Sequence, residues 1–81
     1  MATMLGSSPV GKEHYDFDQI EILGASEPVM GERCNIRYWS NGSTNTVQTS
    51  PVVNWHIGYY DGRNSIEIET ANSFYTGALV N

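Results

Sequence analysis

The segment VVNWHIGYYDG, residues 52–62, has the composition of a β-strand that runs into a turn. Val, Ile, Tyr and Trp favour strands, and Asp-Gly favours a tight hairpin turn. Because successive side chains of a strand point to opposite faces, the segment divides into two sets. The set expected in the core is Val53, Trp55, Ile57 and Tyr59. The set expected at the surface is Val52, Asn54, His56, Gly58 and Tyr60.

Three other segments alternate in the same way: DFDQIEIL (16–23), RCNIRYW (33–39) and SIEIET (65–70). Each therefore predicts a strand with one apolar and one polar face. The side chains expected to face the core are Ile20, Ile22, Cys34, Ile36, Tyr38, Ile66 and Ile68.

Turn signals separate these segments. Residues 24–32 contain Gly, Pro and Gly, and predict a turn without a helix. Residues 40–51 are the most loop-like and begin with Asn-Gly around a type I′ turn, although part of them could form a polar edge strand. Since no window has helical periodicity over two turns, we expect an all-β fold. Short strands at this spacing favour an immunoglobulin-like antiparallel β-sandwich of six to seven strands, with a sandwich that is incomplete at the C-terminus as an alternative.

The length of 81 residues indicates one domain with a small core. Residues 1–13 are polar and lack periodicity, so we expect a flexible arm there and a single domain over 14–81. The lone Cys34 excludes an internal disulfide, and its alternating position favours a buried small hydrophobe. A reactive thiol or an intermolecular disulfide is the alternative.

The net charge of −5, with one Lys and three Arg, disfavours binding to nucleic acid or to an anionic membrane surface. No apolar run is long enough to span a bilayer, so we expect no membrane insertion. The N-terminus lacks the pattern of a signal peptide. Charged residues make up only 16% of the chain, and Ser, Thr, Asn and Gly are frequent, as is typical of secreted and cell-surface β modules. We therefore expect an extracellular or cell-surface location, as part of a larger or processed protein.

The order of the turn motifs resembles the CARDB-type immunoglobulin-like module, a β-sandwich repeated in bacterial and archaeal surface proteins. The motifs are Gly31-Glu32, Asn41-Gly42-Ser43, Tyr60-Asp61-Gly62 and Thr76-Gly77, within residues 16–81. Phe74 departs from the leucine of that family, and the chain ends before the family's last two strands would be complete. The resemblance implies a non-enzymatic adhesion or spacer module without catalytic residues. An incomplete sheet would leave an exposed strand edge for a protein partner or for self-association.

No arrangement of residues predicts an enzyme. The two histidines, His14 and His56, have no nucleophile-elbow motif near them in the sequence. Glu67 and Glu69 could be a glycosidase pair, but outward glutamates on a strand are expected to be solubilising. We expect no cofactor. A weak metal candidate is HYDFD, where His14, Asp16 and Asp18 alternate; a solvated, charged edge is the preferred interpretation.

The strongest candidate for binding is a set of aromatic side chains on the polar faces, because exposed Trp and Tyr rings can stack on sugars. The predicted ligand-binding residues are Trp39, Tyr60, Arg37, His56 and Asn54. The alternative is that Trp39 closes the end of the sandwich. Asn41-Gly42-Ser43 is also a glycosylation sequon, but a hairpin turn is the preferred interpretation.

These patterns favour a non-enzymatic structural or adhesive module of a larger surface or secreted protein. The alternatives are a small carbohydrate-binding module that uses exposed aromatics, and a small secreted effector, toxin or inhibitor that acts by surface contacts.

Overall fold

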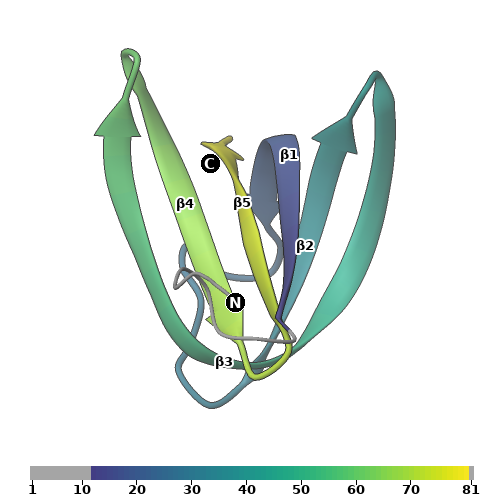
Figure 1. The fold of residues 1–81 in the computed structure, drawn as a ribbon, viewed down its shortest axis with the longest axis vertical. Helices are drawn as coiled ribbons and strands as arrows, with labels where there is room; N and C mark the ends of the chain where they lie inside the picture. Colours follow the sequence, from purple (N-terminus) through teal and green to yellow (C-terminus); the bar gives the residue numbers. More distant parts are fainter. Residues whose placement is uncertain (1–11, 81) are drawn as a thin grey trace, which may run out of the picture.

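A computed structural model describes residues 12–80, which form five β-strands and no helix. The strands are β1 (Glu13–Ile22), β2 (Arg33–Ser40), β3 (Ser43–Tyr60), β4 (Arg63–Thr70) and β5 (Ser73–Leu79). The expected all-β class is confirmed. The described residues form five strands closed into one barrel, where we expected six or seven in a sandwich (Figure 1).

The barrel is a simple meander in which each strand pairs antiparallel with the next one along the chain. Because strand direction alternates, the first and fifth strands run the same way. β1 and β5 therefore pair in parallel, and this pairing closes the barrel. The two strands lie side by side at the centre of Figure 1.

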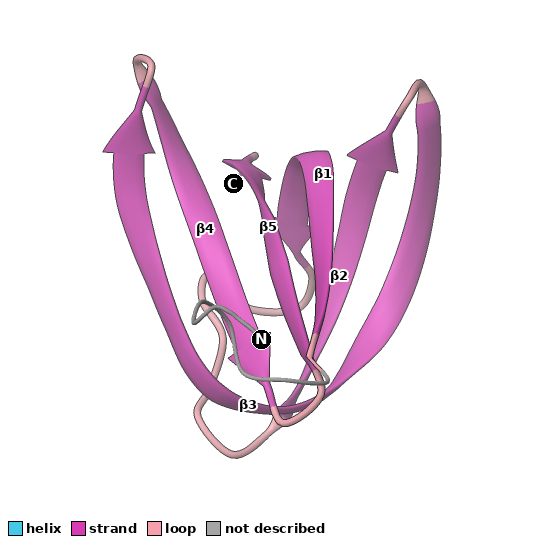
Figure 2. Ribbon diagram, in the orientation of Figure 1, coloured by secondary structure: helices cyan, strands magenta, loops and turns pink. Residues whose placement is uncertain are grey.

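The 18-residue strand β3 explains why the strand count is lower than expected. Its first half pairs with β2 up to Pro51, and its second half pairs with β4 from Val52 onward. The segment expected to be mostly loop, 40–51, is thus largely strand. Figure 2 shows β3 crossing the base of the molecule, with a hairpin rising at each side. Register shifts lie on both sides of this bend, and such bulges bend a strand and increase its twist.

Two-residue turns close both hairpins. Asn41 and Gly42 have φ values of 52° and 82°, and Asp61 and Gly62 have 52° and 77°. A type I′ turn requires positive φ at both central residues, which Asn-Gly and Asp-Gly adopt with little strain. The predicted hairpin turn at Asn-Gly and the turn at Asp-Gly are both confirmed.

The core is made mainly of isoleucine side chains from the strands that the sequence predicted. The buried apolar residues are Ile20, Ile22, Cys34, Ile36, Val52, Ile66 and Ile68. Six of these seven were expected, and Cys34 is a buried hydrophobe as predicted. Tyr38 and Trp55 are half-buried and pack against this core.

The predicted burial of four residues in VVNWHIGYYDG was wrong. Val52 is buried and Val53 is 46% exposed, the reverse of the expectation. The cause is the register shift between Val52 and Asn54, which leaves Val53 as an extra residue. Ile57 and Tyr59 share the inner face with Trp55 but are 41% and 71% exposed, because they lie toward the tip of the β3–β4 hairpin.

Aromatic rings complete the barrel interior beside the isoleucines. The Phe17 ring stacks on Tyr38 with 4.0 Å between centroids, and Tyr15 stacks on Tyr75 at 5.3 Å. A hollow of about 240 Å³ lies among these rings and Val47. A hydrogen bond from the Tyr15 hydroxyl to the Glu13 carboxylate raises the pKa of Tyr15.

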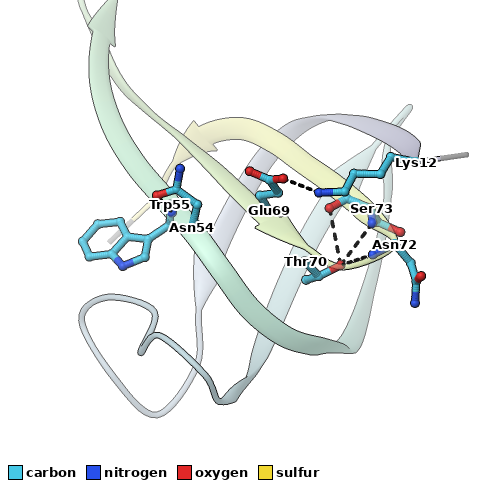
Figure 3. Close-up of polar contacts among 7 residues, drawn as sticks. All are labelled: Lys12, Asn54, Trp55, Glu69, Thr70, Asn72 and Ser73. Atoms are coloured by element: carbon cyan, nitrogen blue, oxygen red, sulfur yellow. Dashed lines mark hydrogen bonds and ion pairs between the residues drawn. The ribbon is translucent and has the colours of Figure 1, made fainter. Parts of the chain in front are cut away.

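A buried hydroxyl anchors the turn between β4 and β5. The Thr70 Oγ1 accepts the backbone N–H groups of Asn72 at 3.3 Å and Ser73 at 3.1 Å (Figure 3). The Asn72 carbonyl in turn accepts the N–H of Glu13 at 3.0 Å, which joins the start of β1 to this turn. Lys12 and Glu13 therefore belong to the fold, although the predicted arm included them; the rest of that arm, residues 1–11, lies outside the described residues.

Candidate functional site

The five predicted ligand-binding residues lie on the outer face in two separate groups. Trp39 and Arg37 come from β2, whereas Asn54, His56 and Tyr60 come from the second half of β3. On the outer face, a row of paired residues crosses the sheet from Trp39 of β2 to Gly58 of β3. The residues between them are Gln19 of β1, Ala78 of β5 and Ser65 of β4. Four strand spacings amount to about 19 Å along the curved sheet. The structure therefore does not unite Trp39 and Tyr60 in one site.

In the β2 group, Arg37 is in an ion pair and Trp39 is half-buried. Arg37 lies opposite Glu21 of β1, and its Nη1 is 2.9 Å from the Glu21 Oε1. The side chain of Trp39 is half-buried in a position opposite Gln19. Because Arg37 is already paired with a carboxylate, it offers a ligand less charge than the sequence suggested.

The β3 group borders a depression of about 330 Å³ on the outer face of β3, β4 and β5. His56 and Tyr60 both line it. The Tyr60 ring lies over Gly58: a Cβ added at Gly58 would be 2.6 Å from the Tyr60 Cε2. Tyr60 is nevertheless 60% exposed, so the end of its ring lies over Gly58 while the side chain remains accessible.

A row of polar side chains from neighbouring strands forms one side of this depression. His56 lies opposite Glu67, and Glu67 lies opposite Thr76. The His56 Nδ1 is 3.6 Å from the Glu67 Oε1, and the Thr76 hydroxyl donates to the Asp16 carboxylate. Glu67 and Thr76, together with Ser65, line the hollow but were not predicted as ligand residues. Alternation within each strand could show that these side chains point outward. It could not show that they lie next to His56 and Tyr60, because that depends on the order of the strands in the sheet.

Asn54 has a different role from the one predicted. Its Oδ1 accepts the backbone N–H of Trp55 at 2.9 Å (Figure 3). Asn54 does not line the depression beside His56 and Tyr60. Its side chain instead accepts the Trp55 N–H, which lies on the side of β3 opposite β4.

The segment before β2 bonds to β3 at Val52, where the Gly31 N–H donates to the Val52 carbonyl and the Val52 N–H donates to the Glu32 carbonyl. From Asn54 onward, β3 has a strand neighbour on one side only among the described residues. Tyr60 and Arg63 flank a two-residue turn and so form its closing hydrogen-bonded pair. Bonded and non-bonded pairs alternate along an antiparallel ladder. The N–H and C=O groups of Trp55, Ile57 and Tyr59 therefore point away from β4. We call this row the β3 edge.

The weak metal candidate does not come together. The His14 ring stacks on Phe74 with 4.7 Å between centroids. Asp16 accepts the Thr76 hydroxyl, and the Asp18 carboxylate accepts the Asn41 N–H at 3.1 Å. A register shift between Asp16 and Gln19 separates the two aspartates. Within residues 12–80, no group of three or more His, Cys, Asp or Glu side chains could hold a metal ion.

The two outward glutamates of β4 have separate partners. Glu69 forms an ion pair with Lys12 (Figure 3). The Lys12 ammonium also lies 4.9 Å from the centre of the Phe74 ring. Glu67 faces His56 instead. Only Glu67 therefore remains available to a molecule in the depression.

Comparison with protein-family models, with curated proteins and with solved structures finds no match to this chain. No helix in the described part of the chain could span a membrane. Function is therefore inferred from the two features described above, the depression beside Tyr60 and the β3 edge.

Proposed function

We propose that the chain is a non-enzymatic adhesive module that pairs with a second copy of itself through the β3 edge. The observation that carries this proposal is the row of backbone groups of Ile57 and Tyr59 on the side of β3 opposite β4. An unpaired strand edge is a template for a strand of another chain. The proposal belongs to the class of surface and secreted interaction modules that the composition and the resemblance to immunoglobulin-like modules favour.

The side chains of the β3 edge support strand addition. Ile57 is 41% exposed and Tyr59 is 71% exposed, and both lie on the inner face of the sheet. A strand added at this edge would place its own side chains beside them, so main-chain hydrogen bonds and apolar contact would act together. No Lys, Arg, Asp, Glu or Pro interrupts residues 54–60, although such residues commonly protect edges.

The edge is complementary to itself. Antiparallel pairing of two copies about a twofold axis at Ile57 places Ile57 opposite its counterpart and Tyr59 opposite Trp55 of the second copy. Aromatic pairs across strands stabilise a sheet. The first half of β3 is a weaker candidate, because its corresponding residues, Thr44, Thr46 and Gln48, have short or polar side chains.

Sedimentation velocity from micromolar to millimolar concentration tests the proposal. The parent chain should form a dimer as its concentration rises. Tyr59→Pro should remain monomeric, because proline removes an N–H that points away from β4 without removing a bond to that strand. Thr44→Pro is the matched control, since its N–H points to the free side of the other hairpin, and it should dimerise normally. A parent chain that stays monomeric throughout, or equal association of both variants, would refute the proposal.

A further inference from the structure

We propose that the depression beside Tyr60 is a binding site for a neutral pyranose sugar, which is independent of the β3 edge. The site lies on the outer face of the sheet, whereas Ile57 and Tyr59 lie on the inner face. An aromatic ring at one end and hydrogen-bonding side chains along one side match the two surfaces of a sugar ring, its C–H face and its hydroxyl rim.

Small side chains explain why the sheet is hollow at this place. Gly58, Ser65 and Ala78 are neighbours in register across β3, β4 and β5. Taller side chains border them, with Tyr60 leaning over Gly58 and with His56 and Glu67 in the next row. The volume of about 330 Å³ lies at the lower end of the range of small-molecule sites.

Tyr60 is placed to act as a stacking surface. An exposed tyrosine at the end of a hairpin would ordinarily have free rotation, but this ring rests on the backbone at Gly58. A Cβ at that position would collide with Cε2, Cζ and the hydroxyl oxygen, at 2.6 to 2.9 Å. Glycine therefore permits a ring orientation that presents an apolar face beside the polar groups. Such amphipathic aromatic surfaces suit the C–H face of a pyranose.

The polar groups can both accept and donate hydrogen bonds. The Glu67 carboxylate accepts, and the Ser65 hydroxyl does both. The Thr76 hydroxyl gives its proton to Asp16, which leaves its oxygen free to accept from a sugar hydroxyl. Glu67 has a 41% exposed side chain, so water or a ligand can reach it.

The charges of the site select a neutral ligand. Glu67 lines the hollow and Asp16 contacts Thr76 beside it, whereas no Lys or Arg belongs to the lining. Arg63 lies opposite Tyr60 in the register but outside this lining. Two nearby carboxylates repel phosphates and acidic sugars. The site therefore differs from the one that the sequence predicted, because it uses Glu67, Ser65 and Thr76 in place of Trp39 and Arg37.

Titration of the ¹⁵N-labelled chain with neutral hexoses, N-acetylhexosamines and their short oligomers tests this site by NMR. At least one should produce saturable shifts at His56, Ser65, Glu67, Thr76 and Ala78. Millimolar affinity is expected, because an open depression buries little of its ligand. Glucuronate should bind more weakly than glucose. Shifts centred on Trp39, or no saturable shift with any of these sugars, would overturn the proposal.

Matched variants identify the stacking surface. Tyr60→Ala should weaken binding roughly tenfold, which corresponds to about 1.4 kcal/mol. Gly58→Ala should weaken it similarly while keeping every ligand-contacting side chain, because the added methyl displaces the Tyr60 ring. Tyr59→Ala and Trp39→Ala should bind as the parent does; a loss in either one equal to that of Tyr60→Ala would contradict the assignment. Tyr59→Pro separates the two proposals, since it should abolish dimerisation and retain sugar binding.

Discussion

Asn54 protects the backbone of its own neighbour: its Oδ1 accepts the Trp55 N–H at 2.9 Å (Figure 3). Trp55 pairs with Ile68 at a position where its N–H points away from β4. The Asn54 amide therefore occupies the first of the outward donors on the β3 edge. The outward donors that remain unoccupied are the N–H groups of Ile57 and Tyr59.

Removing this cap should strengthen self-association. Asn54→Ala frees the Trp55 N–H for a bond across the dimer, so the dimer dissociation constant should fall several-fold, as the net value of about 1 kcal/mol for one hydrogen bond implies. Sedimentation velocity measures the change. Asn54→Asp keeps an acceptor at the same position and should leave the constant closer to that of the parent. Weaker association of Asn54→Ala would show that the cap does not protect the edge.

Thr49 should be a sensitive position for stability, because it is a buried polar residue at the bend of β3. It is 1% exposed; its Oγ1 accepts the Cys34 N–H at 3.0 Å and donates to the Ser50 carbonyl at 2.7 Å. Thr49→Val leaves the Cys34 N–H without this acceptor, at a cost of about 1–3 kcal/mol in the free energy of unfolding. Urea denaturation measures this loss. Thr46→Val, at an exposed position of the same strand, should change the free energy by less than about 0.5 kcal/mol; equal losses would contradict the role of the buried hydroxyl.

The alternation of β1, β2 and β4 predicted their buried residues because most of those core positions lie in regular pairings. Cys34 lies at a register shift, but the extra residue there belongs to β3, so β2 keeps its alternation. Ile66 and Ile68 are examples, and both are almost completely buried. The prediction failed at Val52 and Val53, since one extra residue reverses the faces and no local signal marks it. Pro51 suggested the end of a loop, whereas the strand continues through it at a bend. The closed barrel depends on this continuity of β3, which the turn-rich composition of residues 40–51 concealed.

The candidate site was predictable in part for a related reason. His56 and Tyr60 lie on one strand, so alternation alone placed them on one face. Glu67 and Thr76 join them through pairing between strands, and alternation does not give strand order. The sequence grouped Trp39 with Tyr60 because alternation placed both aromatic side chains on the polar faces of their strands. In the structure, four strand spacings separate the part of β2 that holds Trp39 from the second half of β3.

Two strand glycines should respond differently to alanine. A Cβ at Gly77 would lie 3.0 Å from the Ile20 Cγ1 and 3.1 Å from the Phe17 carbonyl oxygen, both in a packed region. Gly77→Ala should therefore destabilise the fold by about 1–3 kcal/mol. At Gly58 the collision is with the end of the exposed Tyr60 side chain, which can rotate away, so Gly58→Ala should cost less than about 1 kcal/mol. Thermal and urea unfolding of the two variants compare them directly, and an equal cost would contradict the packing contrast.

Cys34 should make the stability depend on pH in the alkaline range. Its side chain is buried, and burial raises the pKa of the thiol above its ordinary value of 9.0. Because the folded state favours the protonated thiol, the stabilisation is complete below the unfolded pKa and is lost as the pH rises through the folded pKa. The parent chain should therefore lose stability above about pH 9 more steeply than Cys34→Ala does.

Urea unfolding at a series of pH values measures this difference between the two chains. The raised pKa of Tyr15 acts in the same direction, but Tyr15 is present in both chains and its effect cancels in the comparison. Slow reaction of the native thiol with a disulfide reagent, with fast reaction after unfolding, should accompany the effect, since only the accessible thiolate is nucleophilic. Parallel pH profiles for the parent and Cys34→Ala, or rapid labelling of the native chain, would show that Cys34 is not held protonated by burial.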